Sequence, residues 1–143
     1  MKCRIILDPH REEEVLIYAH SRTPLVDALE NLASGAQTEL IGYRDGEALR
    51  LELGQICCIT TEGGKVFALT TDGKWNLKTR LYLLEELLSP DFIKINQSTL
   101  ANPLQIERFD TSMAGTLKVK FKNGTVDYVS RRNLKKVKER LGL

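Results

Sequence analysis

Residues 92–102 carry the side chains of this 143-residue chain that are best suited to specific binding. Residues 92–96 alternate apolar and polar side chains, which is the two-residue period of a strand. The alternation stops at residues 97–99, where amide and hydroxyl side chains follow one another, and Asn102-Pro103 indicates a turn. Such groups donate and accept hydrogen bonds, and amides suit the N6 and N7 atoms of adenine. The segment therefore predicts a strand that presents a hydrogen-bonding loop, although an ordinary polar surface turn has the same composition.

The elements that must position this loop are predicted to be short antiparallel strands. Four glycine-containing dipeptides supply the positive φ angles of tight hairpin turns: Asp45-Gly46, Gly63-Gly64, Asp72-Gly73 and Asn123-Gly124. The strands expected around them are 39–43, 47–53, 55–61, 65–70, 74–77, 116–122 and 125–129. Strands at this spacing favour an α+β protein that is mainly β, with few helices.

Three helices are expected, at 24–34, 79–88 and 131–141, together with a turn of helix after Ser98. Thr23 is a suitable cap for the first helix, because its hydroxyl accepts from free backbone N–H groups. Ser130 is the corresponding cap of the last helix. The lysines and arginines of that helix form a basic surface that attracts phosphate without reading sequence.

Residues 1–38 form a leader that precedes the hairpins, and residues 39–143 form the main domain. The leader is predicted to be β-β-α, with strands at 3–7 and 15–18 before the first helix. Its apolar residues are many for so short a segment, so we expect it to help form a homodimer.

Three blocks of this sequence resemble the LytTR family of bacterial DNA-binding domains. F-I-K-I-N-Q-S-T-L-A-N at 92–102 is similar to the core signature of the family. Residues 80–88 resemble its single helix, while 117–124 and V-S-R-R at 129–132 resemble its closing strand, turn and helix start. The blocks occur in the family's order across about residues 40–141. The leader resembles that of free-standing family members, which lack a receiver domain.

The resemblance implies elongated antiparallel sheets, a role in transcription, and recognition of double-stranded DNA through loops in the major groove. Family members bind paired repeats as dimers. Carried over by position, the base-reading residues are Asn96, Gln97, Ser98 and Arg132. Residues that would contact the DNA backbone or support the site are Lys65 in the Gly63-Gly64-Lys65 turn, Lys94, Asn102, Arg131 and, from the basic helix, Lys135. For Asn102 the alternative is that it braces its own loop.

Departures from the family pattern leave the recognised bases open. Lys94 stands where the family usually has arginine, and Thr99 replaces a larger apolar residue. Asn96 and Gln97 occupy positions that are variable and often histidine or basic.

Charge is distributed unevenly along the chain, whose net charge is +2. Residues 1–73 contain 7 Lys/Arg and 12 Asp/Glu, a balance of −5, whereas residues 74–143 contain 14 and 7, a balance of +7. A basic half favours a polyanionic partner.

Nothing in the sequence indicates an enzyme, a cofactor or a metal centre. The three cysteines give no disulfide framework, and Cys57 and Cys58 are expected to be unreactive strand residues in the reducing cytoplasm. No segment is apolar for long enough to insert into a membrane.

Two other functions are compatible with the sequence. The chain could be a non-enzymatic module that senses a ligand or a regulatory protein partner, with only non-specific affinity for nucleic acid. RNA binding is the weaker alternative, because the aromatic residues are scattered rather than paired on one strand.

Overall fold

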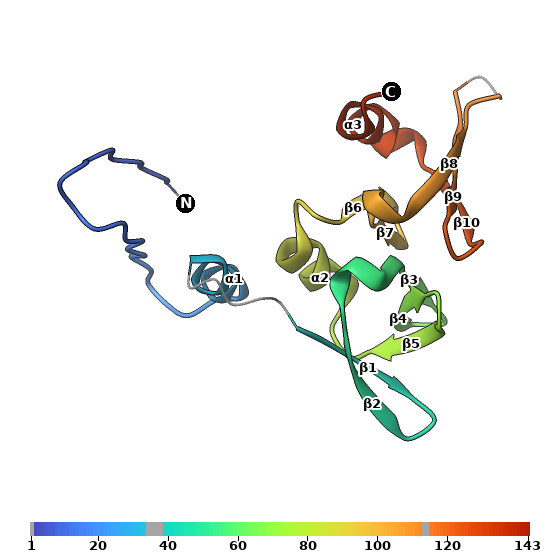
Figure 1. Cartoon of the computed structure of the whole chain (residues 1–143), viewed down its shortest axis with the longest axis horizontal. Coiled ribbons are helices and arrows are strands. Elements are labelled where there is room, and N and C mark those ends of the chain that lie inside the picture. The colour runs from blue at the N-terminus through green and yellow to red at the C-terminus, as the bar shows by residue number, and fades with distance from the viewer. Residues whose placement is uncertain (1, 34–38, 113–114) are drawn as a thin grey trace. The chain divides into compact units, whose positions relative to one another are not determined.

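The computed structural model describes residues 2–33, 39–112 and 115–143. Contacts divide the chain into two units, Met1–Ala36 and Gln37–Leu143, and each is described by itself (Figure 1).

The N-terminal unit contains one helix, α1 (Pro24–Ala33), as predicted. Thr23 caps it, since its Oγ1 accepts from the backbone N–H of Val26 at 3.3 Å. The strands predicted at 3–7 and 15–18 are wrong: the chain there forms no strand pairing, and its apolar side chains are exposed. Two strands alone are marginal in water, and in the described part of this unit only Ala28 is buried, so no core holds a hairpin in place.

The larger unit is built on a seven-stranded sheet in which every strand pairs antiparallel with its neighbours. Its order is β2-β1-β5-β4-β3-β7-β6 (Figure 1). The strands are β1 (Leu40–Arg44), β2 (Glu47–Leu51), β3 (Ile56–Glu62), β4 (Lys65–Thr70), β5 (Gly73–Leu77), β6 (Ile93–Asn96) and β7 (Thr99–Ala101). A 3-10 turn, η1 (Leu53–Gln55), links β2 to β3.

A second sheet has three strands in the order β10-β9-β8. These are β8 (Ile106–Asp110), β9 (Leu117–Phe121) and β10 (Val126–Val129). Leu117, Val119 and Phe121 of β9 are fully buried, as their alternation with lysines predicted. The hairpins predicted from turn dipeptides are confirmed, whereas β7 and β8 were not predicted as strands.

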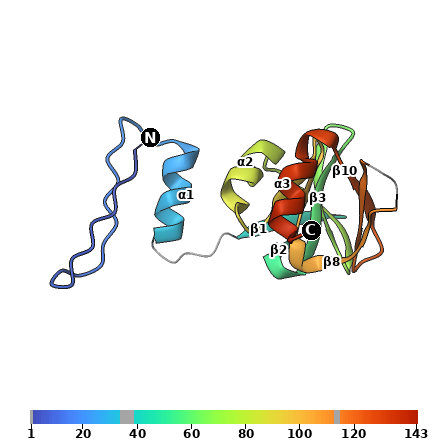
Figure 2. The same cartoon turned by 90° about the horizontal axis from the view of Figure 1, so that it is seen from above.

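Two helices complete the unit, α2 (Leu81–Leu88) and α3 (Arg131–Leu141), and Figure 2 shows them on the same side of the strands. The predicted turn of helix after Ser98 is wrong. Residues 99–101 form β7, whose Thr99 and Leu100 pair with Thr60 and Ile59 of β3. A helical turn, η2 (Pro103–Gln105), follows later.

The larger unit contains two hydrophobic clusters. The first joins α2 to the seven-stranded sheet, and the second joins α3 to both sheets. The β6–β7 hairpin contributes to both, since Leu100 of β7 belongs to the first cluster while Ile95 of β6 and Ala101 of β7 belong to the second. The turn between these strands is therefore held on a rigid support.

No helix-turn-helix occurs in the described part of residues 90–140, which contains β6–β10, η2 and α3. Among the helices that the structure describes, none has the length and apolar character needed to span a membrane.

Candidate nucleic-acid interface

The predicted reading loop is the two-residue turn between β6 and β7. Gln97 and Ser98 form its exposed tip. The backbone N–H of Ser98 donates to Oδ1 of Asn96 at 2.9 Å, and the Ser98 carbonyl accepts from the N–H of Thr61 at 2.9 Å. The loop is thus shorter than predicted and is anchored on β3.

The turn between β3 and β4 lies next to it because Thr61 makes that hydrogen bond. Gly63 and Gly64 have φ angles of 57° and 78°, a left-handed pair that favours glycine at both positions. Lys65 follows the turn and is exposed. The third contact predicted from the sequence is therefore adjacent to the first.

The residues that lead into α3 are hydrogen-bonded to β6, the first strand of the same hairpin. The N–H of Ser130 donates to the carbonyl of Ile95 at 2.8 Å, and Nδ2 of Asn96 donates to the carbonyl of Tyr128 at 2.9 Å. Ser130 precedes α3, but its hydroxyl makes no capping bond to the helix backbone; it accepts from Nδ2 of Asn133 at 2.7 Å. The prediction of a hydroxyl cap is wrong because Asn133 occupies that hydroxyl.

We call these three converging segments the basic edge: residues 63–65, 96–98 and 131–132. Arg131 and Arg132 are exposed, and no ion pair within the described residues involves them. The first turn of α3 contains no acidic residue. The charges of Arg131 and Arg132 and the positive end of the α3 dipole repel one another. The arrangement is therefore suited to binding an anion from outside the chain.

The two lysines predicted to hold phosphate differ in their surroundings. Lys135 is exposed one turn further along α3. Lys94 is partly buried, and its Nζ lies 3.9 Å from Oε2 of Glu85 on α2. Lys135 is therefore the freer of the two cations.

Asn102 is buried and braces its own loop, which is the alternative that the sequence left open. Its Nδ2 donates to the carbonyls of Ile56 at 3.0 Å and Leu53 at 3.5 Å, and its Oδ1 accepts from the N–H of Leu104 at 3.1 Å. It joins η1 and η2 and is not part of the basic edge.

Asp127 on β10 was not among the predicted site residues, yet its carboxylate lies against the β6–β7 hairpin. It accepts from Nδ2 of Asn96 at 3.1 Å and from Oγ1 of Thr99 at 2.7 Å. Asp127 lies 31 positions after Asn96 and 28 positions after Thr99 in the sequence. Only the contact between the two sheets brings them together, so no local pattern could have found it.

The adjacent cysteines Cys57 and Cys58 are free thiols that lie buried in the second hydrophobic cluster. Burial, with a smaller contribution from Cys57 and Asp127, raises the pKa of the Cys58 thiol to about 12. Burial also raises the pKa of Cys57. Both thiols are therefore protonated near neutral pH and poor nucleophiles.

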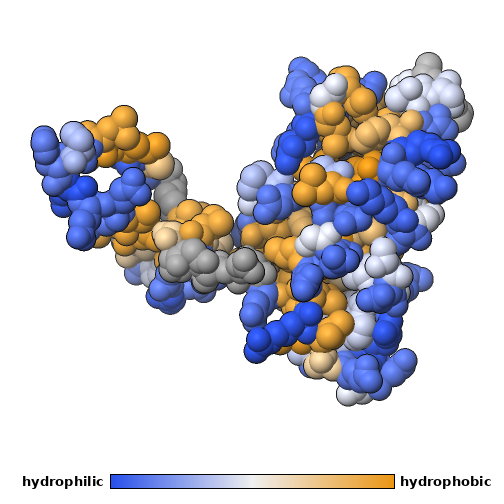
Figure 3. Space-filling view, in the orientation of Figure 1, coloured by the Kyte–Doolittle hydropathy of each residue, from blue (hydrophilic) through white to orange (hydrophobic). Residues whose placement is uncertain are grey.

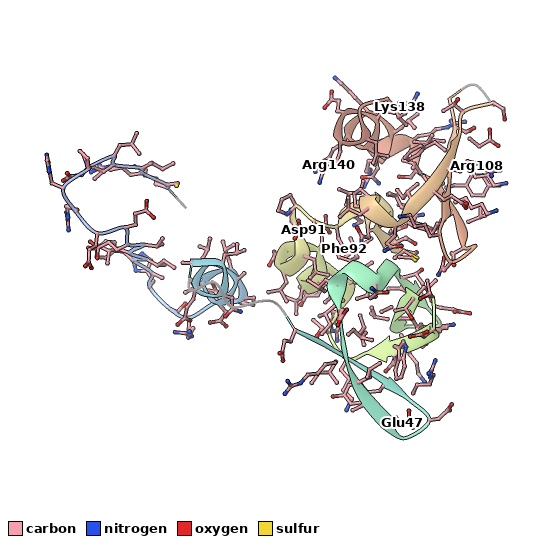
Figure 4. The ribbon with its side chains drawn as sticks, in the orientation of Figure 1. Glu47, Asp91, Phe92, Arg108, Lys138 and Arg140 are labelled. Carbon is pink, nitrogen blue, oxygen red and sulfur yellow. The ribbon has the colours of Figure 1, made fainter. Side chains whose placement is uncertain are left out.

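A groove of about 350 Å³ lies at the other end of α3, beside Asp91, Phe92 and Arg140 (Figure 4). Arg140 donates to the carbonyl of Pro90 at 3.4 Å. Because eight residues of helix rise by about 12 Å, this groove is separate from Arg132. In the described part of the chain no group of His, Cys, Asp and Glu could hold a metal ion.

Comparison with known proteins places these features in a family. The model of the LytTR DNA-binding domain matches residues 46–142. HTH-type transcriptional regulators of Staphylococcus aureus, strains NCTC 8325 and MRSA252, are 30% identical to this chain over 146 residues, covering 100% of the chain and 99% of each relative. The LytTR DNA-binding domain of a methyl-accepting/DNA response regulator from Bacillus cereus has a similar fold. Its TM-score is 0.70 at 18% identity, over 75% of this chain and 99% of that domain.

Proposed function

This chain belongs to the LytTR family of DNA-binding transcriptional regulators, and from that premise we propose that it reads repeated sites in double-stranded DNA as a homodimer, through the loops of its basic edge. The observation that carries the proposal is the convergence of three exposed segments on one edge, tied together by backbone hydrogen bonds. It is a binding protein and not an enzyme.

Base reading is assigned to Asn96, Gln97, Ser98 and Arg132. Gln97 and Arg132 are exposed, and an amide or a guanidinium fork can meet two groove atoms at once. The amide of Asn96 already donates to Asp127 and Tyr128. A base contact from Asn96 therefore uses a free lone pair of its Oδ1.

Backbone contacts are assigned to Lys65, Lys94, Arg131 and Lys135. A cation near the phosphates sees the same field at every sequence, so these residues raise affinity without choosing a site. Lys94 must exchange Glu85 for phosphate, so we expect it to contribute less than Lys135.

Dimerisation is assigned to the leader. Its apolar residues are exposed to solvent, and the exposed fraction of Leu7 and Tyr18 is 91%. Hydrophobic residues cover part of the leader's surface (Figure 3). An open hollow of about 510 Å³ lies beside Val15 and Ile17, so the extended segment does not pack tightly against α1. Segments of this size lack a core of their own and are stabilised by association. A second copy supplies that surface, and the S. aureus relatives align over their full length, leader included.

A binding experiment on three nucleic acids tests the proposal. The full chain is titrated onto duplex DNA from its own promoter, a scrambled duplex of equal composition, and RNA of the same sequence. We expect tighter binding to the promoter duplex and a complex of two chains. Equal affinity for all three would instead support a sensing module with non-specific nucleic-acid affinity, whose exposed leader binds a regulatory protein. The proposed location is the cytoplasm, where DNA and a reducing environment coincide.

A further inference from the structure

Asn96, the partly buried last residue of β6, is held by hydrogen bonds from every polar atom of its side chain. Both hydrogens of its amide are donated, to Oδ1 of Asp127 at 3.1 Å and to the carbonyl of Tyr128 at 2.9 Å. Its Oδ1 accepts from the N–H of Ser98 at 2.9 Å. The Asn96 side chain therefore links the β6–β7 turn to β10.

The carboxylate of Asp127 is the centre of this network. Oδ1 accepts from Asn96, and Oδ2 accepts from the buried hydroxyl of Thr99 at 2.7 Å. Thr99 Oγ1 lies 3.3 Å from Oγ1 of Thr60 on β3, and the backbone N–H of Tyr128 donates to Oδ1 of Asp127 at 2.8 Å. Hydrogen bonds to a charged carboxylate are stronger than those between neutral groups.

Asp127 also lies four residues before Arg131, on β10, the strand that leads into α3. One carboxylate thus fixes the turn that carries Gln97 and Ser98 and, through β10, the start of the helix that carries Arg132. A reading group must be held to within a fraction of an ångström, because its hydrogen bonds weaken steeply with distance and angle.

We propose that Asp127 is a positioning residue that sets the sequence specificity of the basic edge by fixing the geometry of the Asn96–Ser98 loop. This inference rests on the proposed function and goes beyond it, since Asp127 is given a role in positioning and not in base contact. A carboxylate beside a phosphate-binding edge repels DNA, so its charge lowers affinity for every duplex while its geometry raises discrimination between them.

Two substitutions at Asp127 separate charge from geometry. Asp127→Asn removes the charge but keeps an oxygen that accepts from Asn96 and an amide that donates to Thr99. Asp127→Ala removes both charge and contacts. We expect both variants to bind random duplex more tightly than the wild type at low salt. Only Asp127→Ala should lower the ratio of specific to random affinity strongly, by about 5- to 150-fold, the range of one lost bidentate base contact.

Two further variants are matched controls. Thr99→Val keeps the shape and the Asp127 charge but removes the hydrogen bonds that the Thr99 hydroxyl makes with Asp127 and Thr60, so the ratio should fall less and random binding should not increase. Asp45→Asn removes the same charge from the β1–β2 turn. Asn tolerates the left-handed backbone of that position, where φ is 49°, so specificity should not change.

The experiment uses the full chain and a duplex selected by the wild type from a random pool, with a scrambled duplex as reference. Hydrogen exchange of the Asn96 side-chain amide and the Ser98 N–H is measured by NMR in the absence of DNA. Exchange should be faster in Asp127→Ala and Thr99→Val than in the wild type and Asp45→Asn. If Asp127 only stabilised the fold, Asp127→Ala would lower the melting temperature without changing the affinity ratio.

The inference is overturned if Asp127→Ala keeps the wild-type ratio, or if Asp127→Asn loses as much specificity as Asp127→Ala. If Asp127→Ala does not fold, Thr99→Val decides: an unchanged ratio overturns the inference, and a lowered ratio supports it. A wild type that selects no duplex would instead contradict the proposed function, while the exchange measurement would still test whether Asp127 holds the loop.

Discussion

Cationic side chains on the basic edge and beside it differ in what they can recognise, although they carry the same charge. Arg132 offers a planar fork of donors, whereas Lys135 offers a single charge on a flexible chain. Both are exposed, and neither forms an ion pair within residues 2–33, 39–112 and 115–143. Their roles can therefore be separated by mutation without disturbing the core.

Arg132→Ala should cost about 1–3 kcal/mol of binding free energy on the selected duplex and much less on random duplex. Lys135→Ala should weaken both duplexes alike and reduce the slope of log K against log salt by about one unit. Binding isotherms at several salt concentrations measure both effects, with Arg140→Ala, at the far end of α3, as the control. Equal loss on both duplexes in Arg132→Ala would make Arg132 only a phosphate contact.

Thiol reactivity should distinguish the cysteines. A pKa of about 12 leaves roughly one Cys58 side chain in ten thousand as thiolate at pH 8, and burial excludes reagent as well. Exposed Cys3 is an internal control that should react quickly with iodoacetamide, while Cys57 and Cys58 should react only after unfolding. Mass spectrometry of the labelled peptides is the measurement. Fast native labelling of either buried thiol would contradict the assignment.

The raised pKa of Cys58 has a consequence at high pH. The folded state keeps this proton up to about pH 12, whereas an unfolded thiol loses it near its ordinary pKa of 9.0. The unfolded state therefore binds fewer protons than the folded state between these values, and stability falls as pH rises through that window. Cys58→Ala should show a shallower decline of unfolding free energy over the same range.

At the scale of elements, the side chain of Asn102 joins the two 3-10 turns η1 and η2. The first of these turns precedes β3, and the second follows β7. Asn102 satisfies the carbonyls of Leu53 and Ile56 and the N–H of Leu104, and its removal leaves buried polar groups without partners. The support of the basic edge therefore depends on a buried residue that lies outside that edge.

Asn102→Ala should lower the free energy of unfolding by about 2–4 kcal/mol, because the buried carbonyl of Ile56 and the part-buried backbone groups of Leu53 and Leu104 lose their partner. Urea denaturation measures the change. Leu104→Ala, whose side chain is 80% exposed, is the neighbouring control and should change stability by less than about 0.5 kcal/mol. Normal stability in Asn102→Ala together with weakened DNA binding would reassign Asn102 to the interface.

At the scale of the whole molecule, the two units differ in how they are stabilised. The larger unit has two hydrophobic clusters of its own. The leader exposes apolar residues along its extended segment: Ile5, Ile6, Leu7, Val15, Leu16, Ile17 and Tyr18. A chain that carries such a surface is expected to associate through it.

Deleting residues 1–38 should convert the proposed dimer to a monomer while the remaining domain stays folded. Leu16→Lys in the full chain should weaken the dimer without removing any segment, since burying an unpaired charge opposes association. Light scattering across a concentration series measures both, and Arg11→Ala, an exposed polar change in the same leader, is the control. A deletion variant as dimeric as the full chain would place the dimer interface elsewhere.

The sequence by itself determined the hairpins and helices of the larger unit, and its motifs identified the family. Local signals suffice there: glycine pairs such as Gly63-Gly64 require particular φ angles, and the alternation of Leu117, Val119 and Phe121 defines a buried face. Only the tertiary structure decided that residues 99–101 form a strand, because pairing with β3 outweighs local preference. It also decided that residues 3–7 and 15–18 form none, since a strand needs a partner and a core that this segment lacks in one chain. The role of Asp127 likewise depends on a contact between two sheets, which no spacing along the chain can reveal.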